Sequence, residues 1–181
     1  MKLTLILGPM KSGKSFDLIR YFAPLAYTKK HFDLYQPLRN VRDSLITSRN
    51  GVNLESQKVA SLEALLESRA SVIGVDEIHM LDPADVKHID MLLRRGKDVV
   101  ASGLDTDYSG RMFDIIKGLL ELGPHEVRYR KSVCERCQEP DAIYSQVFHK
   151  GIPVTSGMPA VIPDDGTFTY MPACRQCFIK E

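Results

Sequence analysis

An eight-residue loop near the start of the chain constrains its fold more than any other feature. Residues 8–15 read GPMKSGKS, which satisfies the pattern G-x-x-x-x-G-K-[ST]. The apolar run Leu3–Leu7 predicts a strand before the loop, and the amphipathic stretch 15–29 predicts a helix after it. In this setting, the backbone N–H groups of the loop and the positive end of the helix can surround phosphate oxygens. A chance glycine-rich turn is the alternative, and the strand–loop–helix setting argues against it.

The loop supplies the candidate residues for a nucleotide site: Gly8, Pro9, Met10, Lys11, Ser12, Gly13, Lys14 and Ser15. Within the pattern, Lys14 reaches the β- and γ-phosphates and Ser15 is a magnesium ligand. Two acids, Asp76 and Glu77, follow the apolar run 71–75, at the carboxyl end of a predicted strand where ligands bind in such folds. We expect Asp76 to hold magnesium and Glu77 to accept a proton from a hydroxyl or to orient a water. The alternative for both is a solvated or capping acid.

The remaining chain up to residue 131 alternates between strand and helix patterns. Further strands are expected at 32–36, 71–76 and 98–102, and further helices at 61–69, 83–95 and 111–122. Such alternation predicts an α/β fold with a mainly parallel sheet and helices on both faces. The character changes near Cys134, where cysteine pairs flank a stretch rich in Gly and Pro. We therefore predict a nucleotide-binding domain over residues 1–131 and a small second domain over 132–181.

Two close cysteine pairs, Cys134-x-x-Cys137 and Cys174-x-x-Cys177, can present four thiolates to a tetrahedral ion. A closed Cys₄ site leaves no open position, so the expected zinc is structural. The metal would hold the base of the long loop 138–173, which becomes a candidate lid. Redox-active or merely buried cysteines are the alternative.

Composition limits the classes of partner. The 181 residues include 24 Lys and Arg against 23 Asp and Glu, a net charge of +1, which gives no electrostatic case for nucleic acid or a membrane as the main partner. The apolar run at the N-terminus is too short for a signal-peptide core or a membrane span. We therefore expect a cytoplasmic protein, and in a reducing compartment paired cysteines favour metal over disulfides.

Taken together, the motifs resemble those of one family, the small tetrameric, zinc-containing (type II) thymidine kinases. GPMKSGKS resembles the phosphate loop of that family, VDEIHML (75–81) its DEAQF segment, and GLDTDYSGRMF (103–113) its GLDxxFxxxxF segment. The cysteine pairs and the loop between them resemble its zinc domain and lasso. The resemblance covers nearly the whole chain, in the same order and with the same spacing.

This resemblance implies a RecA-like P-loop domain, a zinc domain whose lasso closes over the nucleoside, and a homotetramer. The implied reaction is ATP- and magnesium-dependent phosphorylation of the thymidine 5′-hydroxyl, a step of nucleoside salvage. Glu77 falls on the general base of the family, and Arg42 on an arginine that supports phosphoryl transfer. The residues that fall on the nucleoside pocket are Met10, Met80, Leu104, Tyr108, Phe113, Ser145 and Tyr170.

The chain departs from the family pattern at several of these positions. Asn40 replaces an Asp, His79 a Gln, Met80 and Tyr108 each a Phe, and Lys11 a hydrophobic residue. Met80, Asn40 and His79 keep open a kinase for deoxyuridine or another deoxynucleoside, and Asn40 alone keeps open a non-catalytic nucleotide-binding paralogue. A nucleotide-dependent binding or regulatory protein, whose zinc unit grips a partner, is a further alternative. The departures leave the α/β fold prediction unchanged.

Overall fold

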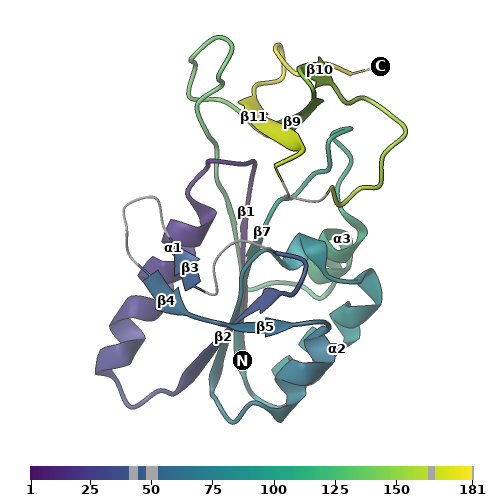
Figure 1. Cartoon of the computed structure of the whole chain (residues 1–181). Helices are drawn as coiled ribbons and strands as arrows, with labels where there is room; N and C mark the ends of the chain where they lie inside the picture. Colours follow the sequence, from purple (N-terminus) through teal and green to yellow (C-terminus); the bar gives the residue numbers. More distant parts are fainter. Residues whose placement is uncertain (41–44, 48–52, 163–165, 181) are drawn as a thin grey trace.

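The computed structural model describes residues 1–40, 45–47, 53–162 and 166–180 (Figure 1). Its largest element is a six-stranded sheet in which every pairing is parallel. The strands follow one another across the sheet as β5 (Gln57–Val59), β2 (Phe32–Pro37), β6 (Val72–Val75), β7 (Asp98–Gly103), β1 (Leu3–Leu7) and β8 (Glu126–Tyr129). The predicted α/β architecture with a parallel sheet is confirmed.

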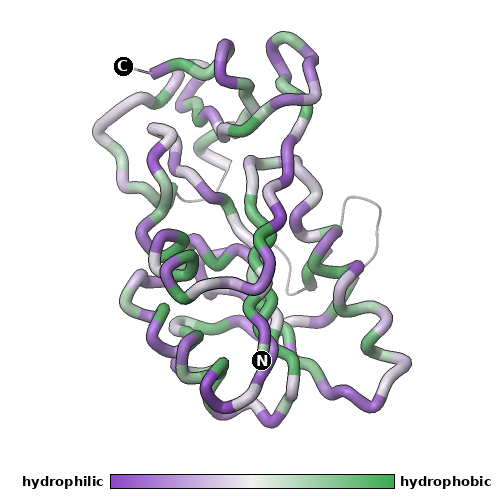
Figure 2. Tube along the Cα trace, turned by 180° about the vertical axis from the view of Figure 1, so that it is seen from behind, coloured by the Kyte–Doolittle hydropathy of each residue, from purple (hydrophilic) through white to green (hydrophobic). Residues whose placement is uncertain are grey.

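Helices cover both faces of this sheet, and strand β1 shows why. Its side chains alternate between the faces, as the pleat of a strand requires. Leu3, Leu5 and Leu7 join one buried cluster with helices α2 (Val86–Arg94) and α3 (Asp114–Glu121), whereas Ile6 joins the cluster on the side of helix α1 (Lys14–Phe22). Figure 2 shows hydrophobic and hydrophilic positions alternating along the helical turns, as expected for helices with one face against the sheet.

Three of the predicted helices differ from the expected form. The first ends at Phe22 and passes into the 3₁₀ helix η1 (Ala23–Tyr27), because Pro24 has no N–H to donate and its ring collides with the carbonyl one turn earlier. The expected helix at 61–69 is the 3₁₀ helix η2 (Leu62–Glu67). The expected helix at 83–95 begins as the 3₁₀ turn η4 (Pro83–Asp85) and continues as α2.

Several short strands were not expected from the sequence. They are the edge strands β5 and β8 and the antiparallel hairpin of β3 (Leu45–Thr47) and β4 (Asn53–Glu55). Segments of three or four residues are too short to show a period of two.

The second unit is a three-stranded antiparallel sheet above the carboxyl edge of the large sheet (Figure 1). Strand β9 (Tyr144–His149) lies between β10 (Ile152–Pro153) and β11 (Phe168–Ala173). The long loop between the cysteine pairs is therefore partly an ordered sheet, which the sequence did not predict.

The helices of the described residues are all too short or too polar to span a membrane.

Candidate active site

The candidate residues meet at the carboxyl edge of the large sheet. Strands β6, β7 and β1 are adjacent and parallel, so the segments that leave them share one edge. These segments are the phosphate loop 8–15 after β1, the acid pair 76–77 after β6, and the stretch that begins with Leu104 after β7. Ligands bind at this edge in open α/β sheets.

The phosphate loop is preformed around a buried lysine. The Nζ atom of Lys14 donates a hydrogen bond to the carbonyl oxygen of Pro9 at 2.7 Å. Burial lowers the pKa of Lys14, and the nearby carboxylates of Glu77 and Asp76 oppose that shift. Gly13 has φ 83°, a left-handed conformation that glycine adopts without strain, just before α1 begins. The ammonium group of Lys14 therefore lies at the N-terminal end of α1. The lysine and the positive end of the helix dipole would both attract an anion such as phosphate.

Asp76 is buried beneath the loop and is well supplied with hydrogen-bond donors. Its Oδ1 atom accepts hydrogen bonds from the Ser102 hydroxyl and, at 3.0 Å, from the Glu77 amide. The Ser15 hydroxyl also donates to this carboxylate. Burial, followed by the charge of Glu77, raises the pKa of Asp76 to about 6 despite these donors. The Ser15 and Asp76 oxygens, side by side, suit a hard cation such as magnesium.

The raised pKa of Asp76 leads to a stability prediction. The unfolded value is near 3.9, so the folded chain binds the extra proton between about pH 4 and pH 6 and loses stability as pH rises through that window. At pH 7.5 the buried charge then costs about 1–3 kcal/mol. We expect Asp76→Asn to raise the unfolding free energy of the nucleotide-free protein by that amount at pH 7.5, and by much less at pH 4. Urea unfolding at both pH values measures this, and an equal change at both would contradict it.

Glu77 lies at the boundary between the acid pair and a cavity. Its backbone has φ 52°, an uncommon left-handed conformation for a residue with a side chain. The side chain is 18% exposed and lines the cavity. Asp76 and Glu77 are thus neighbours with different surroundings, one buried against Ser102 and the other facing open space.

All seven candidate nucleoside residues line this same cavity: Met10, Met80, Leu104, Tyr108, Phe113, Ser145 and Tyr170. They come from the phosphate loop, the 3₁₀ turn η3 (Ile78–Met80), the segment after β7, and strands β9 and β11. Leu104 and Phe113 also belong to the main buried cluster. Each of them therefore packs in the hydrophobic core and lines the cavity as well. The fold therefore brings together residues more than 150 positions apart.

Most of the departures from the family pattern also lie around the cavity. Asn40, His79 and Met80 line it, and the Asn40 Nδ2 atom donates to Gln36 Oε1 at 3.1 Å. Lys11 is not among the residues that line this cavity. Its Nζ atom forms an ion pair with Glu135, which lies between Cys134 and Cys137 in the sequence. Arg42, the expected support for phosphoryl transfer, lies outside the described residues.

Sequence reasoning did not single out several polar residues at this edge, among them Ser102 and Asp105, nor Thr106 and Asp107 of the cavity wall. Ser102 lies within the buried run of β7 and donates a hydrogen bond to Asp76, but nothing in its pattern singles it out. Asp105 lies in the 103–113 segment, and burial raises its pKa. Its Oδ1 atom has no hydrogen-bond partner in the described part of the chain. The resemblance of that segment was the available signal for Asp105.

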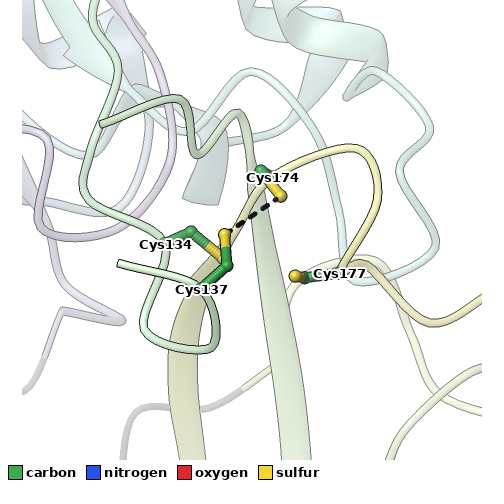
Figure 3. A group of neighbouring side chains, drawn as sticks. All are labelled: Cys134, Cys137, Cys174 and Cys177. Atoms are coloured by element: carbon green, nitrogen blue, oxygen red, sulfur yellow. Dashed lines mark hydrogen bonds between the residues drawn. The ribbon is translucent and has the colours of Figure 1, made fainter. Parts of the chain in front are cut away.

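The four cysteines form a compact cluster that could hold a metal ion (Figure 3). Their sulfur atoms all lie within 4.8 Å of one another, and those of Cys137 and Cys174 are 3.7 Å apart. Four thiolates around zinc at about 2.3 Å place the sulfurs about 3.8 Å apart, so the set fits a tetrahedral ion. Burial would raise the pKa of Cys134, but N–H groups of Cys137, Cys174 and Arg136 lower it to about 6. Cys134 is therefore ionised near neutral pH, whereas hydrogen bonding to the neighbouring thiols raises the pKa of Cys177 to about 12, so a bound metal would have to displace that proton.

The second unit contacts the phosphate loop directly. The Met10 amide donates to Ser145 Oγ at 2.9 Å, and the Ser132 hydroxyl donates to the Lys11 carbonyl at 3.0 Å. Gly8, at φ 145°, lies so close to the chain before the first cysteine pair that a Cβ atom there would be 2.2 Å from the Arg130 carbonyl oxygen. The loop is thus braced from outside by residues 130–145.

Comparison with protein-family models matches residues 1–178 to the thymidine kinase family. The match covers both cysteine pairs, the phosphate loop and every residue around the cavity. It supports a kinase that acts on a nucleoside with a nucleotide as second substrate. The sequence motifs, the parallel sheet with its cysteine cluster, and this match together show that the chain belongs to the thymidine kinase family.

Proposed function

We propose that this protein transfers the γ-phosphoryl group of ATP to the 5′-hydroxyl of thymidine and releases dTMP. The observation that carries the proposal is the cavity in which Glu77 lies among the seven candidate nucleoside residues. Met10 belongs to both the phosphate loop and the cavity wall, so the two substrates would meet beside Glu77. An in-line transfer requires that arrangement of donor and acceptor.

Each residue at the edge of the sheet has a role in this proposal. Lys14 would offset the negative charge of the β- and γ-phosphates, and Glu77 would accept the proton of the 5′-hydroxyl as its oxygen attacks phosphorus. Ser15 and Asp76 would hold magnesium, which supplies further charge neutralisation when it is bound with ATP. Arg42 is proposed to support the transfer. Backbone N–H groups of the phosphate loop would bind the phosphates, except at Pro9, which has no N–H, and at Met10, whose N–H donates to Ser145.

The polar groups of the cavity wall connect it to the loop between β10 and β11. The Tyr108 hydroxyl donates to the Met158 carbonyl at 2.7 Å, and the Tyr170 hydroxyl donates to the Ile162 carbonyl at 3.2 Å. The described part of the loop is thus held over the cavity by two tyrosines. We propose that it acts as the lasso that covers the nucleoside and excludes water from the transfer.

Specific observations favour a second candidate, a kinase for another deoxynucleoside. Met80, His79 and Asn40 all line the cavity at positions where the family pattern has other residues. A methionine thioether is flexible where an aromatic ring is rigid, so the pocket can adapt to a different base. Structural zinc at the four cysteines, the homotetramer, the cytoplasmic location and the division after residue 131 belong to our proposal as well.

The test is ATP-dependent phosphorylation of a nucleoside panel by the purified protein with magnesium, and Lys14→Ala as the control. The panel comprises thymidine, deoxyuridine, deoxycytidine and purine deoxynucleosides. We expect thymidine to give the highest kcat/KM, with turnover lost in the control. Preference for another nucleoside would support the second candidate. ATP binding without turnover of any nucleoside would overturn the proposal in favour of a non-catalytic paralogue or a regulatory protein.

A further inference from the structure

His79 is a buried imidazole that is fixed in place beside the candidate general base. It lies in η3, two residues after Glu77, and only 4% of the residue is exposed. Its ring packs against that of Phe113, with centroids 5.0 Å apart. On another side, a Cβ atom at Gly103 would come within 3.2 Å of both the backbone N and the Nδ1 atom of His79. The ring therefore has little freedom to turn.

The hydrogen bonds of the ring define where its proton lies. The Leu104 amide donates to His79 Nδ1 at 3.2 Å, so Nδ1 carries a lone pair. Burial, reinforced by the positive charge of Lys14, lowers the pKa of His79 to about 3. The ring is then neutral at physiological pH, and we assign its single proton to Nε2. The 3.4 Å separation between Nδ1 and Glu77 Oε2 is consequently not an ion pair.

The Nε2–H group of His79 is a donor at the wall of the cavity. Among the described residues, no acceptor is hydrogen-bonded to it, although His79 lines the cavity. Ser145 and Tyr108 are engaged with the Met10 amide and with Met158, whereas the Thr106 hydroxyl is another polar group of the wall without a partner among the described residues. Nε2 is not among the fully buried polar atoms that lack a partner in the described part of the chain, so water can reach it from the cavity, and an oxygen acceptor of a bound ligand would replace that water.

We propose that the Nε2–H of His79 donates a hydrogen bond to an oxygen of the bound nucleoside and so contributes to nucleoside recognition. This inference rests on the proposed function, because it assumes that the cavity holds the nucleoside. The Leu104 amide sets the tautomer, Phe113 and Gly103 set the ring position, and the neutral ring offers one donor and no charge. Such a group can donate to an uncharged oxygen, either a sugar hydroxyl or a base carbonyl, and needs no compensating charge on the ligand.

Two substitutions distinguish the proposed donor role of His79 from a purely structural one, because the two roles predict opposite results for them. The amide nitrogen of glutamine reaches the position of a histidine Nε2, whereas the side-chain oxygen of asparagine reaches that of Nδ1. His79→Gln therefore keeps the donor toward the cavity and loses the acceptor for Leu104. His79→Asn keeps the acceptor for Leu104 and loses the donor. If His79 served only to cap the Leu104 amide, the asparagine variant would behave like the parent and the glutamine variant would not.

The experiment measures nucleoside Kd by calorimetry, and kcat and KM separately, for the parent and both variants. We expect His79→Asn to weaken nucleoside binding about tenfold or more, with ATP affinity unchanged, and His79→Gln to stay within about threefold of the parent, as loss of a hydrogen bond to a desolvated ligand group predicts. ATP affinity and circular dichroism of each variant show that it is folded.

The outcomes separate the two levels of the proposal. A parent protein that binds ATP but no nucleoside overturns the proposed function, and the assignment of His79 with it. A parent that binds nucleoside, with His79→Asn equal to it, overturns the assignment of His79 alone. Weaker binding by the glutamine variant than by the asparagine variant likewise overturns it, because the acceptor toward Leu104 would then be what matters.

Discussion

Glu77→Gln is expected to lower kcat by about 10²- to 10⁴-fold, the usual contribution of a positioned general base. Glutamine has nearly the same shape as glutamate, but its amide cannot take the proton of an attacking hydroxyl. Glu77 lines the nucleoside cavity, and its neighbour Asp76 provides the carboxylate under the phosphate loop. The variant should therefore bind ATP and nucleoside nearly as the parent does. Single-turnover phosphorylation, with separate measurements of both affinities, checks this expectation.

Glu67→Gln is a matched control, because this substitution removes the same negative charge at an exposed position outside the cavity, the end of η2. It should leave kcat unchanged. Unchanged turnover in Glu77→Gln would remove Glu77 from the role of base. A large loss of ATP affinity instead would place its carboxylate at the phosphates.

The second large effect concerns the cysteine cluster, where Cys174→Ser should release the metal. Structural zinc sites contribute about 10–16 kcal/mol in small zinc-finger peptides, and a tetrahedral site that loses one thiolate loses much of that energy. Cys174 directly follows β11, which carries Tyr170, so we expect the cavity wall to loosen. We expect the variant to contain well below one zinc ion per chain. We also expect its Kd for nucleoside to rise about tenfold or more, because contacts between the cavity wall and the nucleoside are lost.

Elemental analysis of the purified variant and calorimetry with nucleoside give both quantities. Glu139→Gln is the control, since Glu139 is exposed beside the first cysteine pair and is not a thiol. It should retain the metal of the parent. Zinc that remained at one per chain in Cys174→Ser would show that the four cysteines are not the ligand set.

The sequence predicted best the strands in which consecutive residues are all buried. Strands β1 and β7 are almost entirely buried, and their apolar runs gave bounds within one residue of the observed ones. The cysteine cluster was also predictable, because a C-x-x-C pair positions two sulfurs by local geometry alone. For the cavity, composition and periodicity were insufficient. Its residues were assembled through the family resemblance, and their roles stay predictions.

Other features depend on contacts that sequence patterns do not contain. Strand β9 is buried on both faces over Tyr144–Phe148, so it lacks the polar alternation that marks a half-exposed strand. Strand β11 contains Pro172, which argues against a central strand and is tolerated here at the edge of the small sheet. The pairing of Asp76 with Ser102 arises because β6 and β7 are neighbours, a fact of topology. The protonation of His79 follows in the same way from Leu104.

The bracing of the phosphate loop also bears on how the chain folds as it is synthesised. The contacts of Met10 with Ser145 and of Lys11 with Ser132 and Glu135 join residues separated by 135, 121 and 124 positions. The phosphate loop is synthesised before residues 132–145 but gains its full set of contacts only after them, because Ser145 must be made before Met10 can bind it. Such long-range contacts slow folding, since the chain between them must be ordered before they form. Nucleotide binding by a growing chain would therefore report completion of the fold.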